Sequence, residues 1–229
     1  MLSLGIDTTG SSCAVALWAD DVLKFSGAQN MNRGYAEKLM PMIDRALLET
    51  GLTYKNIDVV GVATGPGSFT GLRVGLSAAR GLSLGLNCDL YGVTTFYAAA
   101  LACVRKIGSK DITNLCVILN SRRSNFFLQK FKLQSGSLET IGRPVSSDES
   151  SILRTLANSR SIITGDGAMQ IQLSNDLKKQ TQIIPDSRKS CVALIAELAA
   201  KRDTSQAQTN LSALYINPPQ VTLAPKRTD

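Results

Sequence analysis

A buried strand that runs through a glycine-rich turn into a helix constrains this chain more than any other feature. Residues 58–63 (DVVGVA) are rich in β-branched side chains, which favour a buried sheet position. Residues 64–71 (TGPGSFTG) follow as a tight turn, and a helix is predicted from about 70 to 85. Ser68 or Thr70 is expected to cap that helix, leaving backbone amides free to hold an anion. Such a unit is typical of α/β folds, in which helices cover the faces of a sheet.

The residues before and after this unit predict the rest of a mixed sheet. Three short strands are predicted first, then a helix whose apolar residues 39, 43, 46 and 47 recur at helical spacing. Pro41 lies inside that helix, so we expect the helix to begin late or to be kinked there. A strand and another helix complete the unit. The expected strands are 2–7, 12–18, 22–28 and 90–93, and the expected helices are 35–50 and 94–104.

The second half predicts a further subdomain. Residues 115–120 and 126–132 are predicted to be strands around a polar turn at 121–124, and 161–164 another strand; 191–200 is predicted to be an apolar helix. With a linker-like composition at 105–110, we expect an N-terminal subdomain over 1–104, a second one over 105–216 and a disordered tail over 217–229.

The chain contains no histidine, which excludes several classes of enzyme. It cannot supply a Ser-His or Cys-His pair, an HExxH zinc site or a histidine base. Its five cysteines show no CxxC spacing and are expected to be buried in a reducing compartment. No signal peptide or membrane span is predicted, because the most apolar uncharged stretch, 90–104, is too short. We therefore expect a cytoplasmic, soluble protein without membrane contact.

Charge is unevenly distributed along the chain. Residues 1–104 carry 7 Lys/Arg and 8 Asp/Glu, a net of −1. Residues 105–229 carry 18 Lys/Arg and 10 Asp/Glu, a net of +8, with basic pairs such as 105–106, 122–123, 178–179 and 188–189. A field of this sign favours a polyanion or an acidic protein face. The alternative is a solvated basic surface, which the scarcity of base-stacking aromatics (5%) favours.

Two turns carry the residues that could bind a ligand. Asp7, Thr8 and Thr9 follow the first strand, where a carboxylate beside hydroxyls and amides can hold hydrated Mg²⁺ and phosphate; a plain polar hairpin turn is the alternative. Gly65 and Gly67 lie in the glycine-rich turn, which lacks the Gly-Lys-Ser/Thr of a P-loop.

The predicted helix 70–85 has a face nearly without side chains. Gly71, Gly75 and Ala79 are spaced by four, as are Gly81 and Gly85. Each glycine costs about 1 kcal/mol of helix propensity relative to alanine, so close packing should compensate. The spacing alone does not decide between packing on the sheet and packing on a second protein.

Three motifs of this chain resemble the TsaB (YeaZ) family. They are Ile6–Thr9 (IDTT), residues 37–43 (EKLMPMI) and above all residues 65–73 (GPGSFTGLR), with a strong resemblance over residues 1 to about 100. The resemblance implies the actin-like ATPase fold shared with sugar kinases and ribonuclease-H-like proteins, built from two mixed-sheet α/β subdomains. The chain departs from the family pattern at 33–37, at 120–122, where Asn120 replaces a usual carboxylate, and at 215–217.

The resemblance also implies a function. It implies a non-catalytic accessory subunit, without a cofactor or metal of its own, required for transfer of threonylcarbamoyl to adenosine in tRNA by a TsaD-type enzyme. Asp7, Thr8, Thr9, Gly65 and Gly67 would then be a degenerate nucleotide site. A heterodimer with the TsaD-type subunit, a homodimer in its absence, a TsaE-type ATPase and weak or indirect contact with tRNA are the implied partners. The predicted interface residues are Leu39, Met42, Ile43, Ala46, Leu47, Leu72, Gly75, Leu76 and Ala79.

Two other functions remain as alternatives. The first is a stand-alone ATP-dependent phosphotransferase of the same fold, with Asp7 on Mg²⁺ and both turns on the phosphates. The second is a peptidase, which the lack of histidine disfavours.

Overall fold

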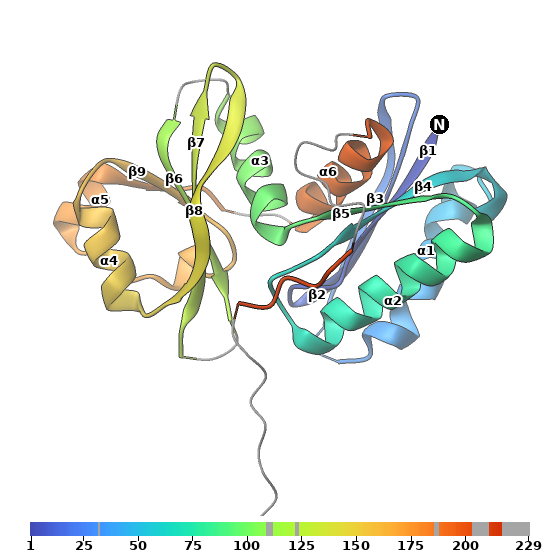
Figure 1. Cartoon of the computed structure of the whole chain (residues 1–229), viewed down its shortest axis with the longest axis horizontal. Coiled ribbons are helices and arrows are strands. Elements are labelled where there is room, and N and C mark those ends of the chain that lie inside the picture. Colours follow the sequence, from blue (N-terminus) through green and yellow to red (C-terminus); the bar gives the residue numbers. More distant parts are fainter. Residues whose placement is uncertain (32, 109–111, 122–123, 186–187, 203–210, 217–229) are drawn as a thin grey trace, which may run out of the picture.

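The computed structural model describes residues 1–31, 33–108, 112–121, 124–185, 188–202 and 211–216. The predicted tail at 217–229 lies outside this part of the chain, as do residues 122–123 of the predicted turn. The described residues form two lobes, each built on a five-stranded mixed sheet (Figure 1). Among them, no helix combines the length and the apolar character needed to cross a membrane.

The first lobe contains the predicted strands and helices. The strands β1, β2 and β3 pair in antiparallel fashion, and β4 and β5 add in parallel on the other side of β1, giving the order β3-β2-β1-β4-β5. The helices α1 and α2 cover one face of this sheet (Figure 1). The bounds are β1 Leu2–Asp7, β2 Ser12–Ala19, β3 Val22–Asn30, α1 Tyr35–Thr50, the 3₁₀ turn η1 Tyr54–Asn56, β4 Ile57–Ala63, α2 Phe69–Leu86 and β5 Asp89–Val93.

The helix α1 runs without interruption through Pro41. Of the two alternatives expected from Pro41, the late start is wrong, because the helix already begins at Tyr35, after a left-handed Gly34; the kink stays a prediction. Pro41 itself is exposed, so its ring lies toward solvent and away from the sheet. The opposite side of the helix carries the predicted apolar residues, which are buried against the sheet.

The second lobe repeats the same topology. Its sheet has the order β10-β9-β6-β7-β8, so an antiparallel meander is again followed by parallel strands added beside its first strand. The helix α4 packs on the outer face of this sheet. The bounds are β6 Ile112–Asn120, β7 Phe126–Gln134, β8 Ser137–Ser147, α4 Glu149–Ala157, β9 Ser161–Thr164, the 3₁₀ turn η2 Ala168–Gln170, α5 Asn175–Gln180 and β10 Thr181–Ile183.

Two helices fill the space between the sheets. The helix α3, Thr95–Ile107, packs on the second sheet, and α6, Arg188–Ala200, packs on the first (Figure 1). The approach of α6 is close: a Cβ added at Gly5 would lie 2.6 Å from the Val192 carbonyl oxygen, and one at Gly61 would lie 2.7 Å from that of Ile195. Glycine at these two strand positions therefore lets the helix backbone rest on the sheet.

The position of α6 corrects the predicted second subdomain, 105–216. After β10 the chain returns to the first lobe, where α6 contacts β1, β2 and β4. Residues 211–216 follow it there, since the amide of Leu214 donates to the Thr64 carbonyl at 2.8 Å. The first lobe is thus assembled from both ends of the chain, because the bare face of its sheet needs a cover that local sequence does not provide. Similarly, residues 105–107 of the predicted linker belong to α3.

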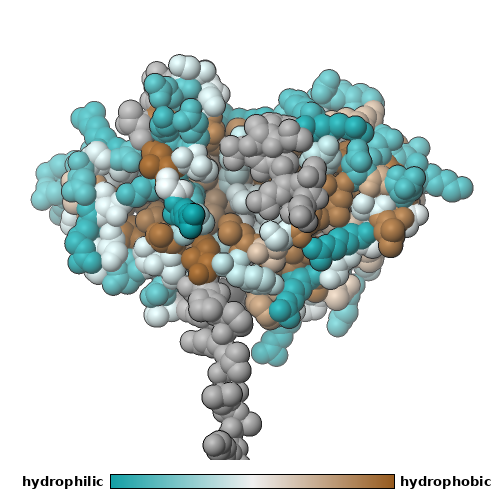
Figure 2. Space-filling model, in the orientation of Figure 1, coloured by the Kyte–Doolittle hydropathy of each residue, from teal (hydrophilic) through white to brown (hydrophobic). Residues whose placement is uncertain are grey.

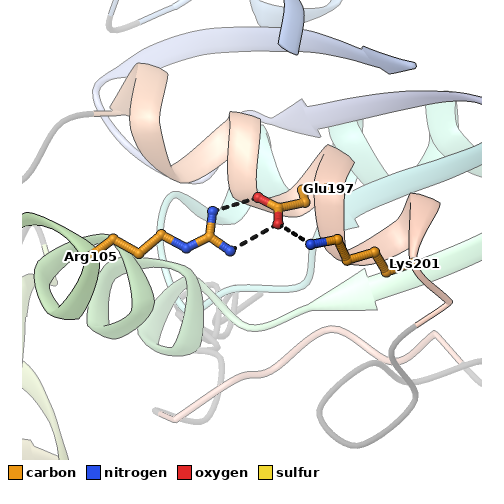
Figure 3. A network of polar contacts seen from close by, with 3 residues as sticks. All are labelled: Arg105, Glu197 and Lys201. Atoms are coloured by element: carbon orange, nitrogen blue, oxygen red, sulfur yellow. Dashed lines mark hydrogen bonds and ion pairs between the residues drawn. The ribbon is translucent and has the colours of Figure 1, made fainter. Parts of the chain in front are cut away.

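A buried carboxylate joins the two central helices (Figure 3). Glu197 on α6 is only 3% exposed, and its oxygens accept from Arg105 of α3 at 2.5 and 2.9 Å and from Lys201 at 2.7 Å. Burial acts against the carboxylate, but the hydrogen bonds and charges of the two cations outweigh it, so the pKa of Glu197 is lowered. The contact links the element that covers the first sheet to the element that covers the second.

Candidate functional site

The turn after β1 is closed by its own hydrogen bonds. The carboxylate of Asp7 accepts from the Thr9 amide at 2.9 Å and from the Thr9 hydroxyl at 2.6 Å, and it is 2% exposed. The Thr9 hydroxyl also lies 3.1 Å from that of Thr95 at the start of α3. This is the arrangement of an Asx-type turn, in which the aspartate organises the local backbone.

The glycine-rich turn packs directly on this first turn. A Cβ at Gly67 would overlap the Thr9 carbonyl, and one at Gly71 would overlap that of Thr8. The amide of Ser68 donates to the Thr9 carbonyl at 2.6 Å, and the Thr8 hydroxyl donates to the Gly71 carbonyl at 2.6 Å. The backbones of the two turns are therefore in direct contact, with no room for a side chain at Gly67 or Gly71.

One of the two predicted cap residues caps the helix, but two of the amides expected to be free are used within the chain. Ser68 caps α2 by accepting from the Gly71 amide at 3.2 Å. Because the amides of both residues are used within the chain, neither is available to an anion. Of the predicted nucleotide-site residues, Asp7, Thr8, Thr9 and Gly65 are buried, whereas Gly67 is half-buried at the edge of a hollow.

That hollow lies between the lobes and has a volume of about 240 Å³. The glycine-rich turn contributes residues 66–70, the second lobe contributes Ser121 and Phe127, and the returning chain contributes residues 214–216. Hydrophobic residues gather in the middle of this face, between the lobes (Figure 2). The predicted site residues are thus brought to one corner of the fold, but the open space lies outside the buried carboxylate.

A cluster at the rim of the hollow was missed by the sequence analysis. The Phe69 and Tyr215 rings lie 5.7 Å apart, and the Arg73 guanidinium lies 3.8 Å from the Phe69 ring centre. About half of each aromatic side chain is exposed. Two of the three residues stand in the GPGSFTGLR motif, which is the signal that could have indicated them.

The structure corrects the residues predicted for a partner interface. Eight of the nine are buried within the chain's own first lobe, on the side of α1 and α2 that faces the sheet, and only Met42 is half-buried. A Cβ at Gly75 would overlap the Thr8 hydroxyl, so this glycine serves packing within the chain. The buried residues are Leu39, Ile43, Ala46, Leu47, Leu72, Gly75, Leu76 and Ala79.

The outward side of the same two helices carries a shallow groove of about 340 Å³. Its lining residues are Ala36, Leu39, Met40, Arg73, Val74, Ser77 and Ala78, mostly apolar or small. Beyond it, Gly81 and Gly85 have no neighbour within 4 Å of an added Cβ, and the Leu84 side chain is 85% exposed. We call this surface, from Ala36 and Met40 across to Leu84, the helix groove.

Two further features describe the chemistry near these turns. Burial, together with the nearby Asp7 carboxylate, raises the pKa of the Cys13 thiol to about 11. Among the described residues, no three His, Cys, Asp or Glu side chains gather closely enough to hold a metal ion. The main features of this region are thus the two turns packed on each other and the open helix groove.

Comparison with known sequences gives consistent matches. The family model described as "TsaD: tRNA N6-adenosine threonylcarbamoyltransferase" matches residues 29–210. The "tRNA threonylcarbamoyladenosine biosynthesis protein TsaB" of Buchnera aphidicola subsp. Schizaphis graminum is 28% identical over 84% of this chain and 91% of its own. The protein of the same name from Escherichia coli K12 is 30% identical over 58% of this chain and 55% of its own.

Comparison with solved structures establishes the fold. A Pseudomonas aeruginosa crystal structure, of an uncharacterized protein with similarity to peptidase YeaZ, superposes with a TM-score of 0.74 at 19% identity, over 94% of this chain and 99% of its own. A ROK hexokinase from Thermus thermophilus superposes with a TM-score of 0.51 at 12% identity, over 89% and 100%. The predicted actin-like ATPase fold is confirmed.

Proposed function

Because the chain belongs to the tRNA N6-adenosine threonylcarbamoyltransferase (TsaD) family, and within it to the TsaB (YeaZ) group, we propose that it is an accessory subunit in tRNA threonylcarbamoyladenosine biosynthesis. It acts by binding a TsaD-type enzyme, which performs the transfer of the threonylcarbamoyl group to adenosine. In this proposal the chain itself contributes no catalytic side chain.

The state of the Asp7 turn carries this proposal. The carboxylate that would serve Mg²⁺ in the phosphotransferase alternative is buried and accepts two hydrogen bonds from Thr9. The backbone of Thr8 and Thr9 is covered by the glycine-rich turn, where phosphates would need open amides. The chain also has no histidine to act as a base. These features support a structural role for the Asp7 turn, in place of ligand binding.

The helix groove supports the partner part of the proposal. It combines exposed apolar groups, including Met40 and Leu84, with small residues that let another helix approach closely. Methionine, aromatic residues and arginine are enriched at protein interfaces, and Arg73 with Phe69 adjoins the groove. We therefore assign the heterodimer contact to the helix groove, in place of the buried side of the same helices. A homodimer on this surface and a further TsaE-type ATPase stay predictions.

Reconstitution tests the function directly. Modification of tRNA is measured in a reconstituted mixture of the TsaD-type enzyme and its other factors, with and without this chain. We expect modified adenosine only when the chain is present. If its omission leaves the yield unchanged, the accessory role is wrong.

A matched pair of methionine variants tests the surface. Met40 lies in the helix groove, whereas Met169 is exposed on η2 of the other lobe. Met40→Glu should weaken binding of the TsaD-type subunit at least about tenfold, because it places a charge in an apolar contact. Met169→Glu adds the same charge at a distance and should bind normally. Equal affinities of the two variants, measured by calorimetry, would remove the helix groove from the interface.

A further inference from the structure

A wide groove in the second lobe lies away from the interlocked turns and from the helix groove. It has a volume of about 1010 Å³ and runs past the C-terminal ends of α3 and α5, beside β10 and the first residues of β6 and β9. Its apolar lining consists of isoleucines, including Ile112 of β6, Ile162 of β9 and Ile184, which follows β10. We call this surface the basic groove, for the side chains that surround it.

Four cations line the basic groove. They are Lys106, Arg160, Lys178 and Lys179, all exposed, and no carboxylate stands among the described residues that line the groove. Within the described part of the chain, Asp176 pairs with Lys179 at 2.9 Å, and the other three cations have no ion-pair partner. The groove therefore carries most of its positive charge uncompensated, which attracts a multiply charged anion.

A buried hydroxyl in the wall of the groove also lacks a partner. Thr181 at the start of β10 is 7% exposed, and its Oγ1 makes no hydrogen bond. A buried polar atom without a partner lowers stability, so most such atoms are satisfied by protein, water or ligand. Neutral donors such as Asn114 and Gln182 line the same groove. These groups suit a ligand rich in oxygen acceptors.

We propose that the basic groove binds the phosphodiester backbone of RNA. Several spaced cations with neutral donors between them match a chain of phosphates. The described residues that line the groove offer no aromatic side chain on which a base could stack, so contact should be independent of base sequence. RNA as the polyanion rests on the proposed function, whose substrate is tRNA; the charges themselves do not depend on it. Lys178 and Lys179 stand at the end of α5, directly before β10, whose first residue is Thr181.

The positions of the lysines have a purely structural explanation that the test must separate. Lys178 and Lys179 stand in the last turn of α5, and Lys106 stands in the last turn of α3. Cations at helix ends stabilise the exposed carbonyls there. That role predicts lower thermal stability on neutralisation and unchanged RNA affinity.

The experiment measures binding of fluorescent tRNA to the full chain by anisotropy, alone and in complex with the TsaD-type subunit, between about 50 and 200 mM salt. Four phosphate contacts predict that the wild-type affinity falls roughly 50–150-fold over this range. Lys178→Gln with Lys179→Gln should reduce that fall to about tenfold and weaken binding at low salt. Lys106→Gln with Arg160→Gln should act in the same way.

The control removes two charges elsewhere, by Lys55→Gln with Arg143→Gln on exposed positions of η1 and β8. If control and groove variants bind tRNA alike, or if polyglutamate of equal charge competes as well as RNA does, the proposal is overturned.

The result is distinguishable from that for the proposed function. Groove variants that lose tRNA affinity but still bind the TsaD-type subunit support the RNA site. If modification depends on the chain but the groove variants bind tRNA normally, the accessory role stands and the RNA site is overturned. If tRNA binds through the groove but is modified equally well without the chain, the RNA site stands and the accessory role is overturned.

Discussion

Gly75 and Gly81 stand on the same helix, yet replacement by alanine should change stability in opposite directions. A Cβ at Gly75 would overlap the Thr8 hydroxyl, which donates a buried hydrogen bond to the Gly71 carbonyl at 2.6 Å. A Cβ at Gly81 would have no neighbour within 4 Å. The two substitutions therefore share the gain in helix propensity and differ in what the added methyl group meets.

The magnitude follows from three contributions. Alanine in place of an interior glycine gains about 1 kcal/mol of helix propensity at either position. At Gly75 this is opposed by overpacking of about 1–3 kcal/mol and by loss of a buried hydrogen bond of about 0.5–1.5 kcal/mol. We expect Gly75→Ala to lower the free energy of unfolding by about 1–3 kcal/mol and Gly81→Ala to raise it by up to about 1 kcal/mol.

Urea denaturation of the isolated chain measures both effects, with the m-value as a check that the unfolded state is unchanged. Thr8→Ala is the diagnostic second substitution, because the Thr8 Cβ lies 3.7 Å from the position of the added Cβ, an ordinary contact. In that background Gly75→Ala should become neutral or stabilising, giving a clear coupling energy. If Gly75→Ala stabilises the wild-type chain as Gly81→Ala does, the packing of α2 on the Thr8 turn is not as described.

The remaining predictions concern buried titratable groups. The pKa of Glu197 is lowered in the folded chain, so its contribution to stability is present above the unfolded pKa of about 4.5 and is lost as the pH falls through the folded value. Glu197→Gln should therefore destabilise at neutral pH and flatten the acid limb of the stability curve; an unchanged limb would contradict the role of Arg105 and Lys201. Burial raises the pKa of the Cys13 and Cys116 thiols to about 11, so both should resist alkylation at pH 8 until urea unfolds the chain, as mass spectrometry of the labelled peptides will show.

Local patterns predicted the first lobe well, because each of its elements carries its own signal. About a dozen consecutive residues carry the signals for the strand at 58–63, the glycine-rich turn and the Ser68 cap. The strand β8 was not predicted: it lies at a sheet edge, and its burial pattern is mostly exposed, so no alternation marks it. The helix α6 was predicted, but its position on the first sheet depends on contacts with residues nearly 200 positions earlier.

The interface residues show a different limit of sequence reasoning. Leu39 and Ile43 form an apolar stripe with helical spacing, and such a stripe looks the same whether it packs on a sheet or on a second subunit. In the structure this stripe packs against the sheet of the first lobe. Met40, one residue away from the stripe, is exposed in the helix groove, where we propose that a partner binds.

The glycines of α2 carry this argument one step further. Gly71 and Gly75 pack directly on the Thr8–Thr9 turn, which lies under the first half of the helix. Gly81 and Gly85 have the same spacing but no neighbours, and they flank the exposed Leu84. Glycines in a helix interior cost stability, and among the described residues the first pair is offset by packing, whereas the second pair has no such contact. Under the proposal that a partner binds the helix groove, packing of that partner against Gly81 and Gly85 would offset their cost.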